Sequence, residues 1–142
     1  MIRTSYVFIM SQTRKQELGS WGEERASVFL SNAGYEVIER NYRVRGGEVD
    51  IIAWHSQVPF GKTLCFVEVK TRQGDGNSPE EGEAERATHQ SKIGRLQRAA
   101  KFYCLEHDID MDRQPIQFEQ MSVYVQDLTD PPVIRHYVVP VE

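Results

Sequence analysis

One segment near the middle of the 142-residue chain reads Leu64-Cys65-Phe66-Val67-Glu68-Val69-Lys70. It is rich in residues that favour strands, so we expect a strand over Thr63–Thr71. Because side chains alternate across a strand, Glu68 and Lys70 share one face. A strand this apolar is expected to be largely buried, and burying a carboxylate and an ammonium costs free energy unless both are compensated. Two compensations are open, namely pairing of the charges with each other or a bound metal ion.

The preceding apolar segment repeats this feature in Gly47-Glu48-Val49-Asp50-Ile51-Ile52-Ala53. We expect a strand over Glu48–Trp54, with Glu48 and Asp50 on one face. If the two strands are neighbours, Asp50 and Glu68 converge on one point. Converging carboxylates repel each other, which raises a pKa or recruits a divalent cation. Oxygen ligands suit Mg²⁺ or Mn²⁺, which also bind phosphate.

Lys70 then stands beside the expected metal. An ammonium in that place can orient the attacking water, stabilise charge on a phosphate or assist proton transfer. This layout is typical of metal-assisted phosphodiester hydrolysis. The plainer interpretation is a solvated strand face, because a Glu-x-Lys triplet occurs by chance in many chains of this length.

Apolar periodicity and turn residues predict the other elements. These are helices over Glu17–Ala33 and Arg86–His107, and strands over Tyr35–Val44, Ile116–Gln126 and Val133–Val139. His55–Lys62 is expected to be a loop. Gln73–Glu85, which holds three glycines, a proline and the acidic run Glu80–Glu85, is expected to be a long mobile loop. The predicted order is α-β-β-β-α-β-β, in a single α/β domain over residues 17–142 after a flexible N-terminal extension over residues 1–16.

Composition narrows the class of protein. Hydrophobic residues make up 39% of the chain, yet no apolar run approaches the roughly 18 residues that span a bilayer, so no membrane association is expected. The net charge of −4 does not exclude a nucleic-acid partner, because local potential matters more than the total. Cys65 and Cys104 do not form a disulfide scaffold, and the four histidines lack zinc-like spacing. We therefore expect a cytoplasmic protein.

Four motifs follow one another between about Leu18 and Leu105: Gly19-x-x-Gly22-Glu23-x-x-Ala26, Arg40-Asn41-Tyr42-Arg43, Gly47-Glu48-Val49-Asp50-Ile51-Ile52-Ala53 and Phe66-Val67-Glu68-Val69-Lys70-Thr71-Arg72. Together they resemble the YraN family of small bacterial proteins, which are similar to Holliday-junction resolvases of the PD-(D/E)xK nuclease superfamily. Lys92, with Arg95-Leu96 and Ala99-Ala100 after it, resembles the second helix of that family. In place of the family's Arg-aromatic-Asp run, this chain has Gln117-Phe118-Glu119.

The resemblance implies a restriction-endonuclease-like core, with a mixed central sheet and helices packed on it. It also implies a Mg²⁺- or Mn²⁺-dependent endonuclease that acts on structured or branched DNA. Glu23 would join Asp50, Glu68 and the Val69 carbonyl around the metal, and Lys70 would position the water. Resolvases cut two strands symmetrically, so the resemblance also implies a homodimer as an expectation.

Arg43, Arg45, Arg72 and Lys92 are our candidates for contacts to nucleic-acid phosphates, which dominate nonspecific affinity. Two other interpretations stay open. The fold could serve as a nucleic-acid-binding module without catalysis, or as a protein-interaction domain whose buried charges pair with one another. Whether Glu48 is a metal ligand also stays open.

Overall fold

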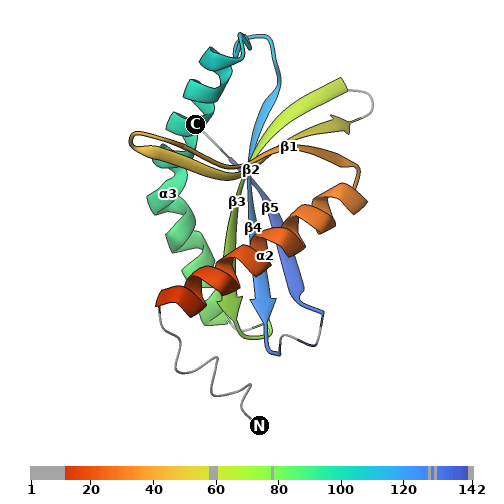
Figure 1. Cartoon of the computed structure of the whole chain (residues 1–142), viewed down its shortest axis with the longest axis vertical. Coiled ribbons are helices and arrows are strands. Elements are labelled where there is room, and N and C mark those ends of the chain that lie inside the picture. Colours follow the sequence, from red (N-terminus) through yellow and green to blue (C-terminus); the bar gives the residue numbers. More distant parts are fainter. Residues whose placement is uncertain (1–11, 58–60, 78, 128, 130, 141–142) are drawn as a thin grey trace.

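The computed structural model describes residues 12–57, 61–77, 79–127, 129 and 131–140. Within these residues two helices and five strands follow the predicted order α-β-β-β-α-β-β (Figure 1). Their bounds are α2 (Gln12–Asn32), β1 (Tyr35–Val44), β2 (Gly47–Gln57), β3 (Gly61–Gln73), α3 (Pro79–Glu106), β4 (Ile116–Val125) and β5 (Val133–Val139). The fold is therefore α/β, as the sequence predicts.

The strands form a mixed sheet in the order β1-β2-β3-β4-β5. β2 runs antiparallel to both of its neighbours, β1 and β3, and β5 is antiparallel to β4. β3 and β4 are parallel, because α3 carries the chain back to the end of the sheet at which β3 began. β3 and β4 contribute buried side chains to both faces of the sheet.

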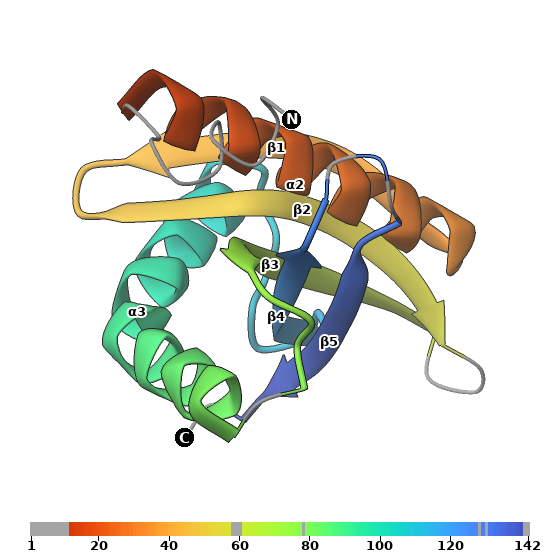
Figure 2. The same ribbon diagram turned by 90° about the horizontal axis from the view of Figure 1, so that it is seen from below.

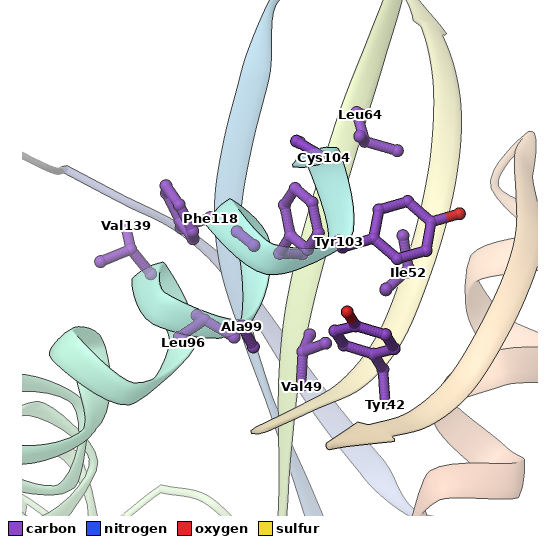
Figure 3. Close-up of a cluster of buried hydrophobic side chains, with 12 residues drawn as sticks. Tyr42, Val49, Ile52, Leu64, Leu96, Ala99, Tyr103, Cys104, Phe118 and Val139 are labelled. Carbon is purple, nitrogen blue, oxygen red and sulfur yellow. The ribbon is translucent and has the colours of Figure 1, made fainter. Parts of the chain in front are cut away.

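The two helices lie on opposite faces of this sheet (Figure 2). On one face, Leu96 and Tyr103 of α3 pack with Phe118 and other buried side chains in a group that we call the α3-side cluster (Figure 3). On the other face, Ala26 and Leu30 of α2 belong to a second buried group, the α2-side cluster. Each face of the sheet thus has its own core.

Residues along β3 alternate between these two cores. Phe66 belongs to the α3-side cluster, whereas Cys65 and Val67 belong to the α2-side cluster. The alternation places Glu68 and Lys70 next on the α3 side of the sheet. This agrees with the expectation that the two charges share one face.

Two glycines allow the helices to lie close to the sheet. A Cβ on Gly22 of α2 would lie 1.7 Å from Oγ1 of Thr71, and one on Gly47 would lie 2.7 Å from the carbonyl oxygen of Arg95. No Cβ fits at either distance, so each glycine is required for the close approach. α2 therefore lies close to β3, and α3 lies against the β1–β2 hairpin.

The predicted loop over Gln73–Glu85 is wrong for its second half, because α3 begins at Pro79. Proline suits the first position of a helix, where its missing N–H has no intrahelical partner, and the glutamates and alanine that follow are good helix formers. The acidic run Glu80–Glu85 thus has a helical backbone. The side chains of this run lie outside the described part of the structure.

Two other boundaries differ from the prediction. α2 begins at Gln12, so residues 12–16 of the expected extension are helical, while residues 1–11 lie outside the described part of the chain. The expected loop over His55–Lys62 is shorter, because β2 continues to Gln57 and β3 begins at Gly61. Among the described residues, neither helix combines the length and the apolar character needed to cross a bilayer.

Candidate functional site

The strands β2 and β3 separate at the point where the predicted carboxylates stand. Their ladder runs from Gln57–Gly61 to Ile51–Val67, after which β2 continues as the partner of β1. A pocket of about 110 Å³ lies there, which is room for several water molecules. Its lining comes from β2, β3 and α3, and consists of Glu48, Asp50, Glu68, Val69, Lys70, Lys92, Arg95 and Leu96.

Asp50 is the part-buried carboxylate of this pocket. Its Oδ2 accepts a hydrogen bond of 2.7 Å from the backbone N–H of Val69. Burial, with smaller contributions from the negative charges of Glu23, Glu68 and Glu48, raises the pKa of Asp50 to about 7 against the opposing effect of that N–H. Asp50 thus carries a charge that its surroundings stabilise poorly, which is typical of functional carboxylates.

The two glutamates of the pocket are paired with cations. Glu68, whose side chain is 12% exposed, has its Oε1 3.2 Å from Nζ of Lys92. Glu48 lies 3.6 Å from Arg95 and 4.0 Å from Arg43. Glu68 therefore pairs with a lysine of α3 rather than with Lys70 of its own strand.

The donor atoms of the pocket fit a hard divalent cation, since three acidic side chains line one small space. Two of the three, Glu48 and Glu68, are paired with cations of the protein. Accordingly, no group of three His, Cys, Asp or Glu side chains that could hold a metal ion is found in the described part of the chain. A metal at this place would compete with Lys92 for the Glu68 carboxylate.

Lys70 lies in the same pocket, two residues beyond Glu68. Within the described residues it has no ion pair, in contrast to Lys92 and Arg95. Its ammonium is thus available to a ligand in the pocket.

Glu23 lies on α2 and is not part of the pocket lining. Its Oε2 is 4.0 Å from Arg40, and the neighbouring Glu24 accepts a 2.7 Å hydrogen bond from the same arginine. The charge of Glu23 nevertheless reaches Asp50, because it raises the pKa of that carboxyl. Glu23 therefore acts on the pocket through its field.

The predicted basic residues have different positions. Lys92 lines the pocket, and Arg43 lies at its border through Glu48. Arg45 is exposed in the β1–β2 turn, where its carbonyl accepts a hydrogen bond from Arg98. Arg72 lies on β3, opposite Tyr124 in register, and does not line the pocket.

Arg95 lines the pocket and was missing from the predicted site. The signal for it is its spacing from Lys92, because residues three apart on a helix lie on the same side. A single helical turn thus brings two cations to the pocket carboxylates.

Comparison with known proteins identifies the family. Residues 22–123 match the model of the uncharacterised protein family UPF0102. The UPF0102 protein of Nocardia farcinica is 42% identical over 123 residues, which cover 86% of this chain and 87% of that protein. The one from Syntrophomonas wolfei is 37% identical over 112 residues, covering 79% and 88% respectively. The chain belongs to UPF0102. This confirms the resemblance to the YraN-type family.

The matched range of the UPF0102 family includes every pocket residue as well as Glu23, and it ends within β4. It also contains Glu119, the residue that stands in the Gln117-Phe118-Glu119 run. β5 lies beyond the matched range.

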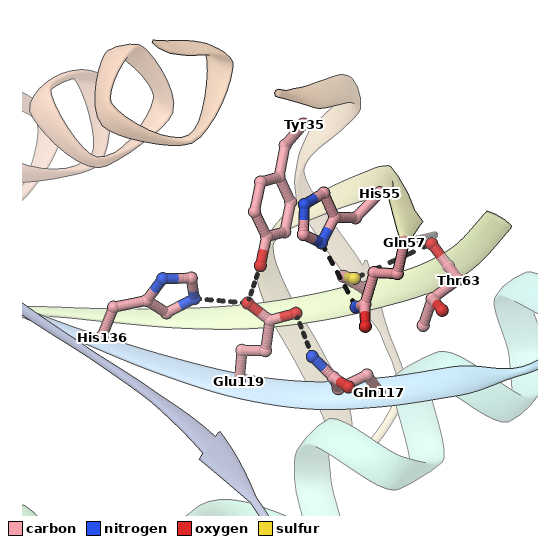
Figure 4. A network of polar contacts seen from close by, with 8 residues as sticks. Tyr35, His55, Gln57, Thr63, Gln117, Glu119 and His136 are labelled. Atoms are coloured by element: carbon pink, nitrogen blue, oxygen red, sulfur yellow. Dashed lines mark hydrogen bonds and ion pairs between the residues drawn. The ribbon is translucent and has the colours of Figure 1, made fainter. Parts of the chain in front are cut away.

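Glu119 of this UPF0102 protein forms a second polar centre, on the α2 side of the sheet (Figure 4). Its side chain is fully buried, and it accepts hydrogen bonds from Tyr35, at 2.9 Å, and from Gln117, at 3.0 Å. Nε2 of His136 contacts the same carboxylate. Burial alone would raise the pKa of Glu119, but its interactions with His136, Cys65 and Tyr35 outweigh burial and lower the pKa.

The sequence gives little sign of this centre, because its members are far apart in the chain. Tyr35 and Glu119 are 84 residues apart, and His136 follows Glu119 by 17. Tyr35 also stacks on His55, with ring centroids 3.9 Å apart. The centre therefore joins β1, β2, β4 and β5 through one carboxylate.

Proposed function

We propose that this protein is a divalent-metal-dependent DNA endonuclease, which hydrolyses phosphodiester bonds in structured or branched DNA. One observation carries the proposal: Asp50, Glu68 and Lys70, from two strands that separate, line one pocket together with two cations of α3. Carboxylates suit a metal ion, and cations at the border suit a phosphate. The resemblance to resolvases supports branched DNA as the substrate class, and a homodimer as the active form.

In this proposal Asp50 and Glu68 hold Mg²⁺ or Mn²⁺, with the Val69 carbonyl as a further ligand and Glu23 adding negative field from α2. When bound, the metal would neutralise charge on the phosphate and lower the pKa of its water. The N–H of Val69 keeps the Asp50 carboxylate in place through its 2.7 Å hydrogen bond. Lys70, which has no ion pair within the described residues, orients the attacking water and stabilises charge on the phosphate.

The test is cleavage of a labelled four-way junction, a flap and a plain duplex, each with Mg²⁺, Mn²⁺ or EDTA. Asp50→Asn and Lys70→Ala are each expected to reduce metal-dependent cutting by at least about 100-fold. Asp112→Asn and Lys101→Ala are matched controls, because both residues are exposed and lie away from the pocket. Thermal unfolding checks that all four variants are folded. Cutting that persists in the two pocket variants would contradict the proposal.

A nucleic-acid-binding module without catalysis is the second candidate. The 3.2 Å pair between Glu68 and Lys92 favours it, since a carboxylate already compensated by a lysine does not require a metal. This candidate predicts metal-independent DNA binding that survives Asp50→Asn and Lys70→Ala, without cutting. If the protein neither cuts nor binds DNA, the remaining interpretation is a protein-interaction domain.

A further inference from the structure

Two cations on one turn of α3 face two carboxylates on two different strands. Lys92 pairs with Glu68 of β3 at 3.2 Å, and Arg95 pairs with Glu48 of β2 at 3.6 Å. All four residues line the same pocket. The absence of a side chain at Gly47 lets the Arg95 backbone of α3 lie this close to β2. The charges therefore meet because of how the helix packs against the hairpin.

The Lys92–Glu68 pair is the more buried of the two. The Glu68 side chain is 12% exposed and that of Lys92 is 35% exposed, whereas Arg95 and Glu48 are 54% and 39% exposed. Exposed ion pairs contribute little free energy, because water screens them. The charged form of Glu68 depends on its partner more than that of Glu48 does, since an unpaired carboxylate that is only 12% exposed costs free energy.

A metal ion and Lys92 both compensate the same carboxylate. A divalent cation at Asp50 that takes Glu68 as a ligand removes the reason for Lys92 to stay there, and the two positive charges then repel each other. Lys92 is a flexible, part-exposed side chain, so its ammonium can leave Glu68 without movement of α3. A phosphate bound at the metal is an anion to which the ammonium can then move.

We infer that Lys92 exchanges Glu68 for a nucleic-acid phosphate when a divalent cation binds, so that Lys92 couples metal binding to nucleic-acid binding. This inference rests on the proposed function and adds a regulatory step to the same site. The pair with Glu68 keeps the lysine away from phosphate until the metal is in place. Lys92 thereby weakens metal binding in the absence of nucleic acid and strengthens nucleic-acid binding once the metal is bound.

The two effects have opposite signs, which a purely structural ion pair would not produce. Mn²⁺ affinity without DNA is measured from the electron paramagnetic resonance signal of free Mn²⁺. Affinity for a fluorescent four-way junction is measured by anisotropy in Ca²⁺ and again in EDTA, because Ca²⁺ also takes oxygen ligands. The variants are Lys92→Met, the conservative Lys92→Arg, and Lys101→Met as a matched exposed lysine of the same helix.

Lys92→Met is expected to bind Mn²⁺ about three- to tenfold more tightly and the junction in Ca²⁺ about three- to tenfold more weakly. The ratio of junction affinities in Ca²⁺ and in EDTA is also expected to fall toward one. Lys92→Arg should retain the wild-type pattern, and Lys101→Met should change none of the three quantities.

The outcomes separate this inference from the function on which it rests. A wild-type protein that binds no Mn²⁺ would overturn both. Wild-type Mn²⁺ binding that Lys92→Met leaves unchanged or weakens would overturn the exchange alone. An unchanged ratio of junction affinities in Lys92→Met would do the same, because it would leave metal and nucleic acid coupled without this lysine.

Discussion

Asp50 and Glu119 are buried carboxylates on opposite faces of one sheet, and their surroundings shift their pKa values in opposite directions. Glu119 is fully buried, yet its pKa is lowered, because its interactions with His136, Cys65 and Tyr35 outweigh the effect of burial. Asp50 lies at a pocket, yet burial raises its pKa to about 7. Only the N–H of Val69 acts against that shift, and three nearby glutamates add to it.

The comparison shows that the number of hydrogen-bond donors, more than the degree of burial, decides whether the pKa of a carboxyl is raised or lowered. A carboxylate with several donors is stabilised in its charged form and can join strands together. A carboxylate with one donor and carboxylate neighbours is stabilised in its neutral form, unless a cation reaches it. We therefore interpret the Glu119 centre as structural and the Asp50 pocket as functional.

Replacing the buried structural carboxylate should have the largest effect on stability. Glu119→Gln keeps the shape but loses the charge that Tyr35 and His136 face, so the free energy of unfolding is expected to fall by about 3 kcal/mol. Urea unfolding at pH 7 measures it. Glu106→Gln is the control, because Glu106 accepts a similar 2.9 Å bond from Tyr42 but is exposed. Equal losses in the two variants would contradict the structural interpretation of Glu119.

The lowered pKa of Glu119 also predicts how its contribution to stability changes with pH. A carboxyl whose folded pKa lies below its unfolded value contributes stability at higher pH, and this is lost as pH falls through the folded pKa. The difference in unfolding free energy between wild type and Glu119→Gln should therefore shrink on acidification below about pH 4.

Replacing the pocket carboxylate of Asp50 should raise the free energy of unfolding, whereas replacing Glu119 should lower it. Asp50→Asn keeps an oxygen that accepts from Val69 and removes the poorly stabilised charge, so in EDTA at pH 8 we expect unfolding to cost about 2 kcal/mol more. Adding Mn²⁺ should stabilise the wild type and leave Asp50→Asn unchanged. A destabilised Asp50→Asn in EDTA would place Asp50 with Glu119, as a structural residue.

The pH dependence of that gain follows from the raised pKa. Below about pH 4 the carboxyl is protonated in both the folded and the unfolded protein, so the variant gains nothing. Between there and about pH 7 the unfolded chain releases the proton first, and the wild type loses stability as pH rises. The gain of Asp50→Asn should accordingly grow across this range and level off above it.

Much of the fold could be predicted from local patterns, and the residues predicted wrongly share a physical cause. β1 and β5 begin and end at the predicted residues, because alternation and turn residues are local signals. The start of α3 was missed because glycines near Pro79 indicate a turn, while proline also begins helices. Local signals thus predict where an element lies more reliably than where it begins.

The candidate site divides in the same way. Glu68 and Lys70 share a strand, so their common face could be predicted. The position of Asp50 beside them could be predicted from the pairing of two neighbouring strands. The pair between Lys92 and Glu68 depends on how α3 packs, and the contact of Tyr35 with Glu119 joins residues 84 apart. Periodicity carries no information on such contacts, which is why the donors of Glu119 could not be predicted.

The smallest expected effect tests whether α2 influences Asp50 as well as the Glu119 side of the sheet. α2 packs on the Glu119 side and also carries Glu23. Gly22→Ala would place a Cβ 1.7 Å from Oγ1 of Thr71 and must push α2 from β3. Overpacking of this kind costs about 1–3 kcal/mol, partly offset by the better helix propensity of alanine, so a net loss of about 1 kcal/mol is expected.

Gly19→Ala is the matched control, because a Cβ there meets nothing within 4 Å, and it should stabilise the protein by about 0.5 kcal/mol. Carbon-13 NMR titration then compares the carboxyls in each variant. If Glu23 acts through its field, the pKa of Asp50 should fall in Gly22→Ala as Glu23 moves away, while Gly19→Ala leaves it unchanged. A pKa of Asp50 that stays near 7 in Gly22→Ala would contradict the contribution of Glu23, and the α2 helix would then belong to the structural face of the sheet alone.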